Sequence, residues 1–392
     1  MKYLLLLFLF PIAFLVANPE QTKTHLPERK TICLNMIVKN ESEVILDCLR
    51  TVKPLIDYWV IFDTGSTDGT QTIIQSYLKD IPGELHESPW VNFSHNRNEA
   101  LAAAKDKADY ILFIDADEIL DYADHFTLPH LNRDVYYYTV RQIDAADCKR
   151  VLLVNSALNW RWEGVLHEAL KSDAIQTAGF LEGIVNICNT TQRGARAKDT
   201  ATRANDIAIL KEAIAKEPTN SRYVYYLGIT YLATEQYKLA LEAFQKRVAM
   251  ESTAVEETYL AHYNIGIAEE ALGNDAATIE SFLTAYRQRP SRAEPLFHLA
   301  VLYRKKNQYL IGYLLANYAR QLPYPAADAC VEYPIYDYRL LVEFANCALL
   351  LGKNQEGLEA CLELLESSTL PQEFRKQVSD NCQLAQARLK PS

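Results

Sequence analysis

The sequence predicts two folded parts, an α/β domain over residues 31–200 and an all-α solenoid of helical repeats over residues 201–370. The first observation behind this prediction is an alternation of strand-like and helical patterns that begins at Thr31. The second is the loss of strand patterns after about Ala201, where a repeat of close to 34 residues takes over. The third is the length of 392 residues, which is enough for two hydrophobic cores.

The α/β domain is predicted from apolar segments that alternate with segments of helical periodicity. Residues 31–38 are almost continuously apolar, a pattern typical of a buried parallel strand. The following segments predict strands at residues 58–62 and 110–114, and helices at residues 44–52, 73–78 and 96–107. This order predicts a parallel sheet with helices on both faces, in which ligands bind beyond the carboxyl ends of the strands.

The repeats are predicted from three segments that align with one another: residues 226–232, 264–270 and 298–304. Each contains a small residue that allows close contact between helices, namely Gly228, Gly266 or Ala300. A fourth, degenerate unit covers about residues 341–366, and residues 371–392 are expected to form a C-terminal helix or tail. We therefore expect stacked helical hairpins. They either hold a protein, as an acceptor or as another subunit, in a concave groove, or only cap the first domain.

Composition and cysteine spacing exclude some classes of partner and site. The formal net charge is −10 and no basic stripe is present, so a nucleic acid is not an expected partner. The eight cysteines contain no C-x-x-C pair, which argues against a zinc cluster and a dense disulfide framework. Several lie in apolar segments, and reduced thiols in the core are the expected state.

The first residues form a segment of their own, with an apolar run from Tyr3 to Ala17. Its length predicts a signal peptide or a short membrane anchor at residues 1–17, followed by a polar linker at residues 18–30. Leu15 would occupy a cleavage position that prefers a small residue. Basic residues after the run favour membrane association with the downstream domain in the cytoplasm, and export after signal cleavage is the alternative.

An acidic cluster follows the predicted strand at residues 110–114. Asp115, Asp117 and Glu118 repel one another, so their burial without a cation would be costly. A Mg²⁺ or Mn²⁺ ion bridging the cluster to a diphosphate would offset that cost. A solvated acidic turn is the alternative interpretation.

Two further segments are candidates for ligand binding. Residues 63–70 follow a strand and open a helix, and Asp63 is the expected acceptor of hydrogen bonds from a nucleoside. The pair His167 and Glu168 begins like a zinc-protease helix, but Lys171 stands where the second histidine would be required. A structural histidine and an additional metal ligand remain the two interpretations of His167.

Five motifs, in this order, resemble family-2 glycosyltransferases of the GT-A type, a Rossmann-like fold, and in particular the bacterial branch fused to tetratricopeptide repeats. They lie at residues 35–41, 63–70, 90–100, 113–118 and 164–168. The resemblance implies that a nucleotide-sugar donor is contacted by four residues: Asn40, Asp63, Arg97 and Asp115. It implies that Mn²⁺ or Mg²⁺ is held by three: Asp115, Asp117 and His167.

The resemblance also implies inversion at the anomeric carbon by direct displacement, with a general base that takes the proton of the acceptor hydroxyl. The candidate bases are Glu168, Glu163 and Asp144, and Glu168 is favoured because it adjoins His167. A glycan, a lipid or a protein is the expected acceptor. The rival hypothesis is a non-catalytic interaction protein with a relic α/β domain. A nucleotidyltransferase would require a glycine-rich triphosphate loop, and the sequence contains none.

Overall fold

A computed structural model of the chain describes residues 29–142, 146–188, 194, 201–251, 254–326, 328 and 330–390. The predicted leader and the candidate base Asp144 lie outside these residues. Within the described part of the chain, no helix is both long and apolar enough to cross a membrane.

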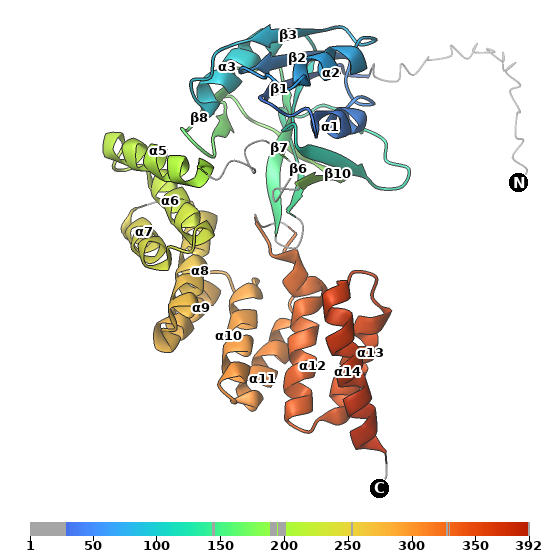
Figure 1. The fold of residues 1–392 in the computed structure, drawn as a ribbon, viewed down its shortest axis with the longest axis vertical. Helices are drawn as coiled ribbons and strands as arrows, with labels where there is room; N and C mark the ends of the chain where they lie inside the picture. The colour runs from blue at the N-terminus through green and yellow to red at the C-terminus, as the bar shows by residue number, and fades with distance from the viewer. Residues whose placement is uncertain are drawn as a thin grey trace, which may run out of the picture.

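The N-terminal part contains an eight-stranded sheet with the order β3-β2-β1-β4-β7-β6-β10-β5 (Figure 1). The strands are β1 (Ile32–Val38), β2 (Tyr58–Asp63), β3 (Gly83–Glu87), β4 (Tyr110–Phe113), β5 (Glu118–Tyr122), β6 (Val135–Gln142), β7 (Asp147–Asn155) and β10 (Ala178–Cys188). A separate antiparallel pair is formed by β8 (Arg161–Glu163) and β9 (Ala169–Lys171).

The sheet is mixed, so the expectation of a wholly parallel sheet is wrong for its second half. Strands β3, β2, β1 and β4 are parallel, whereas β7 is antiparallel to both β4 and β6. The reason is the short connection from β6 to β7, since neighbouring strands joined in this way form an antiparallel hairpin.

Helices cover both faces of the parallel half, as the alternating pattern predicts. Helices α1 (Ile45–Val52) and α2 (Thr70–Tyr77) pack on the face that carries Leu34 and Met36 of β1. Helix α3 (Phe93–Ala104) packs on the opposite face, against Cys33 and the alternate residues of β2. The side chain of Asn92 caps α3 by accepting a hydrogen bond from the amide of His95 at 2.8 Å.

The C-terminal part is a stack of helical hairpins, and the solenoid prediction is confirmed. Its helices are α5 (Thr202–Lys216), α6 (Ser221–Ala233), α7 (Tyr237–Ala249), α8 (Val255–Leu272), α9 (Asp275–Gln288), α10 (Glu294–Lys305), α11 (Tyr309–Ala319), the π-helix η1 (Ile335–Arg339), α12 (Leu340–Leu350), α13 (Asn354–Glu366) and α14 (Gln372–Leu389). The three aligned segments fall in α6, α8 and α10.

Close helix contacts occur at the small residues of the repeat. A Cβ atom added at Gly228 would lie 2.7 Å from the ring of Phe244, and one added at Gly266 would lie 2.6 Å from the ring of Phe282. Both phenylalanine side chains are fully buried. Each glycine therefore makes room for the aromatic ring of the paired helix.

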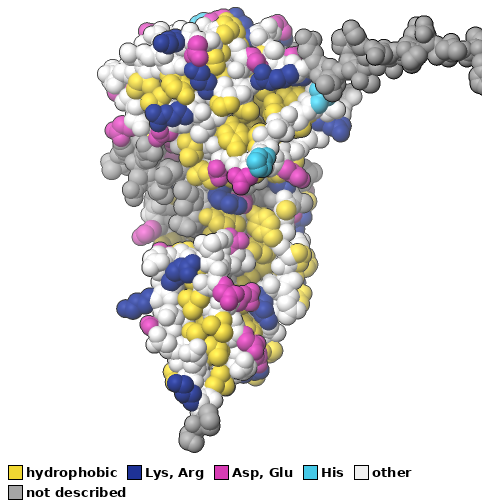
Figure 2. Space-filling model, turned by 90° about the vertical axis from the view of Figure 1, so that its right-hand side faces the viewer, with side chains coloured by type: hydrophobic (Ala, Val, Ile, Leu, Met, Phe, Trp, Pro, Cys, Tyr) yellow, Lys and Arg dark blue, Asp and Glu magenta, His cyan; other side chains and the backbone are white. Residues whose placement is uncertain are grey.

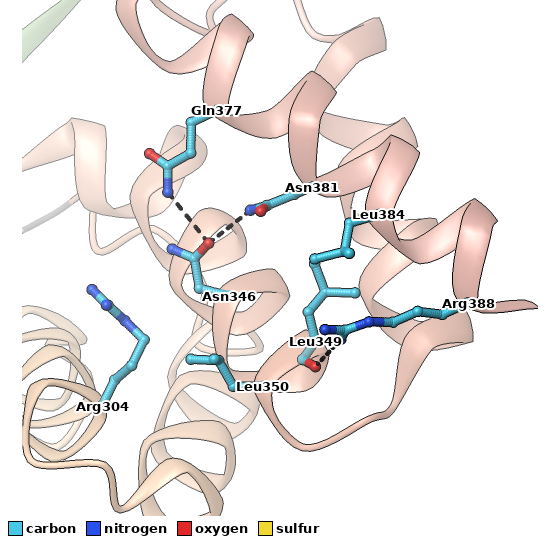
Figure 3. A pocket seen from close by; sticks show the side chains of 8 residues that line it. All are labelled: Arg304, Asn346, Leu349, Leu350, Gln377, Asn381, Leu384 and Arg388. Atoms are coloured by element: carbon cyan, nitrogen blue, oxygen red, sulfur yellow. Dashed lines mark hydrogen bonds between the residues drawn. The ribbon is translucent and has the colours of Figure 1, made fainter.

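A pocket of about 190 Å³ lies between α10, α12 and α14 (Figure 3). Its polar groups bond to one another or to the backbone: Asn381 donates to Asn346 at 2.8 Å, and Arg388 donates to the carbonyl of Leu349 at 2.9 Å. Arg304, on its rim, donates to Glu343 at 2.6 Å. The contacts of Asn381 and Arg388 tie α14 to α12, and that of Arg304 ties α10 to α12.

Among the described residues, the repeats contact the α/β domain in two places (Figure 1). Near α5 and α6, Leu166 packs with Leu210, Ala213 and Tyr223. Near η1, the backbone of Val331 forms an antiparallel bridge with Asp147 at the start of β7. On the face drawn in Figure 2, acidic and basic side chains are interspersed with hydrophobic ones over both parts.

Candidate functional site

The candidate site lies at the carboxyl ends of the parallel strands. Val38 at the end of β1 pairs with Asp63 at the end of β2, and β4 runs parallel to β1 on its other side. The loops that follow these three strands therefore share one edge of the sheet. They carry Asn40, Asp63 and Asp115, which the sequence places in a donor site.

Asp63 is completely buried and holds the loop that follows β2. Its Oδ1 atom accepts hydrogen bonds from the amides of Gly65 and Ser66 at 2.8 and 2.6 Å. Its Oδ2 atom is buried and has no hydrogen-bond partner among the described residues. Because an unpaired buried carboxylate oxygen is costly, a donor group of a bound nucleoside would be stabilised here.

Asn40 braces the same loop from β1. Its side-chain oxygen accepts a hydrogen bond from the amide of Thr67, and its own amide donates to the hydroxyl of Ser66, both at 2.8 Å. Its φ of 56° is left-handed, a conformation that asparagine tolerates better than most residues. In this arrangement Asn40 shapes the loop.

Arg97 of α3 joins two of the predicted site residues. Its guanidinium donates to Asp115 at 2.7 Å and to Glu168 at 2.5 Å, and it lies 5.1 Å from the ring centre of Trp162. The side chains of Arg97 and Glu168 are only 12% and 10% exposed. The backbone of Trp162 exchanges two hydrogen bonds with the side chain of Asn98, which fixes β8 against α3. The structure thus brings Arg97, Asp115 and Glu168 together.

The charges of the acidic cluster are unevenly compensated. Burial would raise the pKa of Asp115, but the charges of Arg97 and Arg150 and the hydrogen bond from Arg97 hold it below its usual value. Glu118 is buried and accepts hydrogen bonds from Arg150 and Asn186. Among the described residues, no side chain donates a hydrogen bond to Asp117. Burial, and then repulsion from Asp115 and Glu118, raises its pKa to about 6 against the opposing charge of Arg150.

Of the three predicted ligands of a divalent cation, Asp117 is the one that the structure supports most clearly. The pKa of its carboxyl group is raised to about 6, so a cation would stabilise its charged form, and oxygen ligands suit Mg²⁺ and Mn²⁺. The ring of His167 stacks on that of Tyr226, with centroids 4.0 Å apart, and its carbonyl accepts a hydrogen bond from Arg222 at 2.9 Å. Among the described residues, no three His, Cys, Asp or Glu side chains form a metal-binding group. Ligation by His167 stays a prediction.

The structure separates the remaining candidate bases. Glu163, on β8, is 39% exposed and lies between Arg161 and Lys171, at 2.6 and 2.8 Å. Hydrogen bonds from Lys171 and Arg161 lower the pKa of Glu163. Glu168 is less exposed and lies next to the acidic cluster through Arg97.

Three contributors to the site were not singled out from the sequence: Arg150, Asn186 and Tyr226. Arg150 comes from β7 and lies 3.7 Å from Asp115. Asn186 comes from β10 and Tyr226 from the first repeat helix pair. No sequence signal could have found the first two, because their proximity depends on the register of antiparallel strands.

The chain is similar to known glycosyltransferases. Residues 33–154 match the family model described as "Glycosyl transferase family 2". The SPbeta prophage-derived glycosyltransferase SunS of Bacillus subtilis (strain 168) is 24% identical over 253 residues, which cover 60% of this chain. The lipopolysaccharide core biosynthesis glycosyltransferase LpsC of Rhizobium meliloti (strain 1021) is 33% identical over 97 residues, 24% of this chain and 35% of LpsC.

Similarity also extends to a repeat protein. A TPR repeat-containing protein of Synechococcus elongatus is 40% identical over 90 residues, which cover 23% of this chain and 21% of that protein. The aligned region spans 56% of the length of SunS, so the chain matches only part of that relative.

Proposed function

We propose that the chain, whose residues 33–154 match the glycosyltransferase family 2 model and are followed by helical repeats, transfers a sugar from a nucleoside-diphosphate donor to an acceptor hydroxyl. One observation carries this proposal. Arg97 joins Asp115 and Glu168 at the carboxyl edge of the sheet, beside Asp117, whose pKa is raised to about 6.

The donor side of the site is supported by Asp63 and the loop that it holds. The unpaired Oδ2 atom of Asp63 is suited to accept a hydrogen bond from a nucleobase or ribose. The amides of Gly65 and Ser66 are already bonded to Oδ1, so the carboxylate is held in one orientation before a ligand arrives. Such preorganisation reduces the entropy that binding costs.

Asp117 and Asp115 would hold a Mn²⁺ or Mg²⁺ ion. When bound, the ion would stabilise the negative charge that develops on the departing diphosphate. The chain itself contributes Arg97, which holds the Asp115 carboxylate at 2.7 Å and keeps it ionised. We propose that this pairing orients Asp115 for its ligand.

Glu168 is the proposed general base. The acceptor oxygen forms a bond with the anomeric carbon while the bond from that carbon to the diphosphate oxygen breaks, and the electron pair leaves with the diphosphate. The hydroxyl proton passes to the Glu168 carboxylate. The configuration of the anomeric carbon inverts because attack and departure occur on opposite faces.

The experiment is a donor-turnover assay with the purified chain, a panel of nucleotide sugars, and Mn²⁺ or Mg²⁺. We expect release of nucleoside diphosphate that requires the cation and is lost in Asp117→Asn. Asp121→Asn is the matched control, since Asp121 is exposed on β5, four residues further along. Binding of the nucleoside diphosphate is measured separately by calorimetry, with and without cation.

The outcomes separate the proposed function from its rival. Turnover that survives Asp117→Asn unchanged would remove the proposed cation site. If no donor were bound or turned over, and both variants behaved like the parent, the non-catalytic interaction protein would be the better account. Glu168→Gln is expected to retain donor binding and lose transfer, a result that Glu163→Gln should not reproduce.

A further inference from the structure

The second contact between the two parts of the chain is a short antiparallel pairing. The amide of Asp147 donates to the carbonyl of Val331, and the amide of Val331 donates to the carbonyl of Asp147, both at 2.8 Å. Arg141 binds the Asp147 carboxylate through two hydrogen bonds and stacks 4.6 Å from the ring centre of Tyr333. These contacts fix the start of β7 against the segment that precedes η1.

Two cysteines face each other next to this bridge. Since Asp147 and Val331 form the hydrogen-bonded pair, Cys148 and Cys330 occupy the adjacent non-hydrogen-bonded pair, where side chains approach most closely. Cα atoms in such pairs are about 4.5 Å apart, within the range that a disulfide spans. The two sulfur atoms are 2.6 Å apart.

This pair differs from the other cysteines of the chain. Five of the eight are buried, where thiols are inert: Cys33, Cys48, Cys347, Cys361 and Cys382. Cys188 is also partly exposed, but within the described part of the chain its sulfur does not contact another cysteine. Cys148 and Cys330 are partly exposed and in contact, so a reagent can reach them.

We propose that Cys148 and Cys330 are a modification site, at which a disulfide covalently joins the catalytic sheet to the helical repeats. The two residues are 182 positions apart and belong to different parts of the chain. The link would be placed two residues before Arg150, which contacts Asp115 and Glu118 of the candidate site. This inference does not depend on the proposed glycosyl transfer.

The oxidant is a low-molecular-weight or protein disulfide. The Cys330 thiolate attacks one of its sulfur atoms, forming a mixed disulfide and releasing one thiolate. Cys148, as its thiolate, then attacks the Cys330 sulfur of the mixed disulfide and releases the second thiolate. Two protein thiols lose two protons and two electrons, and the oxidant is reduced to two thiols. The hydrogen bond from Cys148 and the charge of Arg292 lower the pKa of Cys330, which suits it to attack first.

The test uses the full chain treated with oxidised glutathione, and a second sample treated with a reductant. After unfolding and blocking of free thiols, trypsin releases Cys148 in residues 142–149 and Cys330 in residues 321–339. We expect the oxidised sample to contain these two peptides joined, with a mass two hydrogens below their sum. Thiol titration of the unfolded chain should fall from eight to six.

Variants identify the pair and keep the test independent of folding. Cys148→Ser and Cys330→Ser should each abolish the joined peptide, and Cys188→Ser, the matched control, should retain it. Oxidation should raise the thermal midpoint of the parent by at least about 3 °C and leave that of Cys330→Ser unchanged. Mass spectra of the oxidised parent that show only glutathione adducts, or a link through Cys188, would overturn the proposal.

Discussion

Neutralising Asp117 should make the cation-free protein more stable, because the charged carboxylate of Asp117 destabilises the folded state. Burial and the charges of Asp115 and Glu118 raise the pKa of Asp117 from 3.8 to about 6. The folded state therefore binds this proton more tightly than the unfolded state, and stability falls as the pH rises from about 4 to about 6. Above that range, the full cost is present.

The size of the effect follows from the same pKa. Each pH unit between the folded and unfolded values corresponds to about 1.4 kcal/mol, which gives an upper limit of about 3 kcal/mol. Asp117 is partly exposed, so solvent screening reduces this to about 1–2 kcal/mol. Asp117→Asn should raise the free energy of unfolding by that amount at pH 8 in a chelator, and have almost no effect at pH 4.

The assay is urea denaturation followed by tryptophan fluorescence. All four tryptophans lie in the α/β part of the chain, so the signal reports the unfolding of that domain. Asp121→Asn, at an exposed position of β5, should leave the stability unchanged. Adding Mn²⁺ and a nucleoside diphosphate should stabilise the parent but not Asp117→Asn. A variant that is less stable than the parent at pH 8, or a difference that persists at pH 4, would refute the reasoning.

Other predictions concern the groups around this carboxylate. Arg97→Ala should lower the free energy of unfolding by about 3 kcal/mol and abolish transfer, because it removes the ion-pair partner of the largely buried Glu168 side chain and leaves Asp115 with Arg150 alone. Thermal melting and donor turnover measure the two effects. Gly194→Ala should weaken Mn²⁺ activation by roughly tenfold with little loss of stability, because the added Cβ would lie 2.6 Å from Oδ2 of Asp117. Turnover measured over a range of Mn²⁺ concentrations tests this. Tyr226→Ala should lower kcat at least tenfold, because the ring of His167 loses the ring on which it stacks. The affinity for the donor, measured by calorimetry, should change little.

The sequence was most informative where local pattern decides the structure. Strands β1, β2 and β4 and their helices have the apolar runs and helical periodicity that were expected of them. The pattern missed β3, whose sequence Gly-Glu-Leu-His-Glu is largely polar because it lies at the edge of the sheet. It also missed the antiparallel half of the sheet, although the four-residue connection between β6 and β7 already requires a hairpin.

The site could be predicted only as far as the sheet edge defines it. Asp63 and Asp115 lie there because Asp63 ends a parallel strand and Asp115 comes shortly after another, which the pattern can show. The pairing of Arg97 with Glu168 joins residues 71 positions apart, and that of Arg150 with Glu118 depends on strand register. Neither pairing produces a periodic pattern in the sequence, so these two ion pairs could be found only from the structure.

The repeats contribute to the candidate site as well as extending from it. His167, with a φ of 52°, adopts a left-handed conformation that costs energy for a residue other than glycine. Tyr226 stacks on its ring and Arg222 binds its carbonyl, so α6 holds the segment that supplies Glu168. A cap that served only to cover an apolar face would need no such contacts. Helix α6 is therefore part of the scaffold that holds the candidate site.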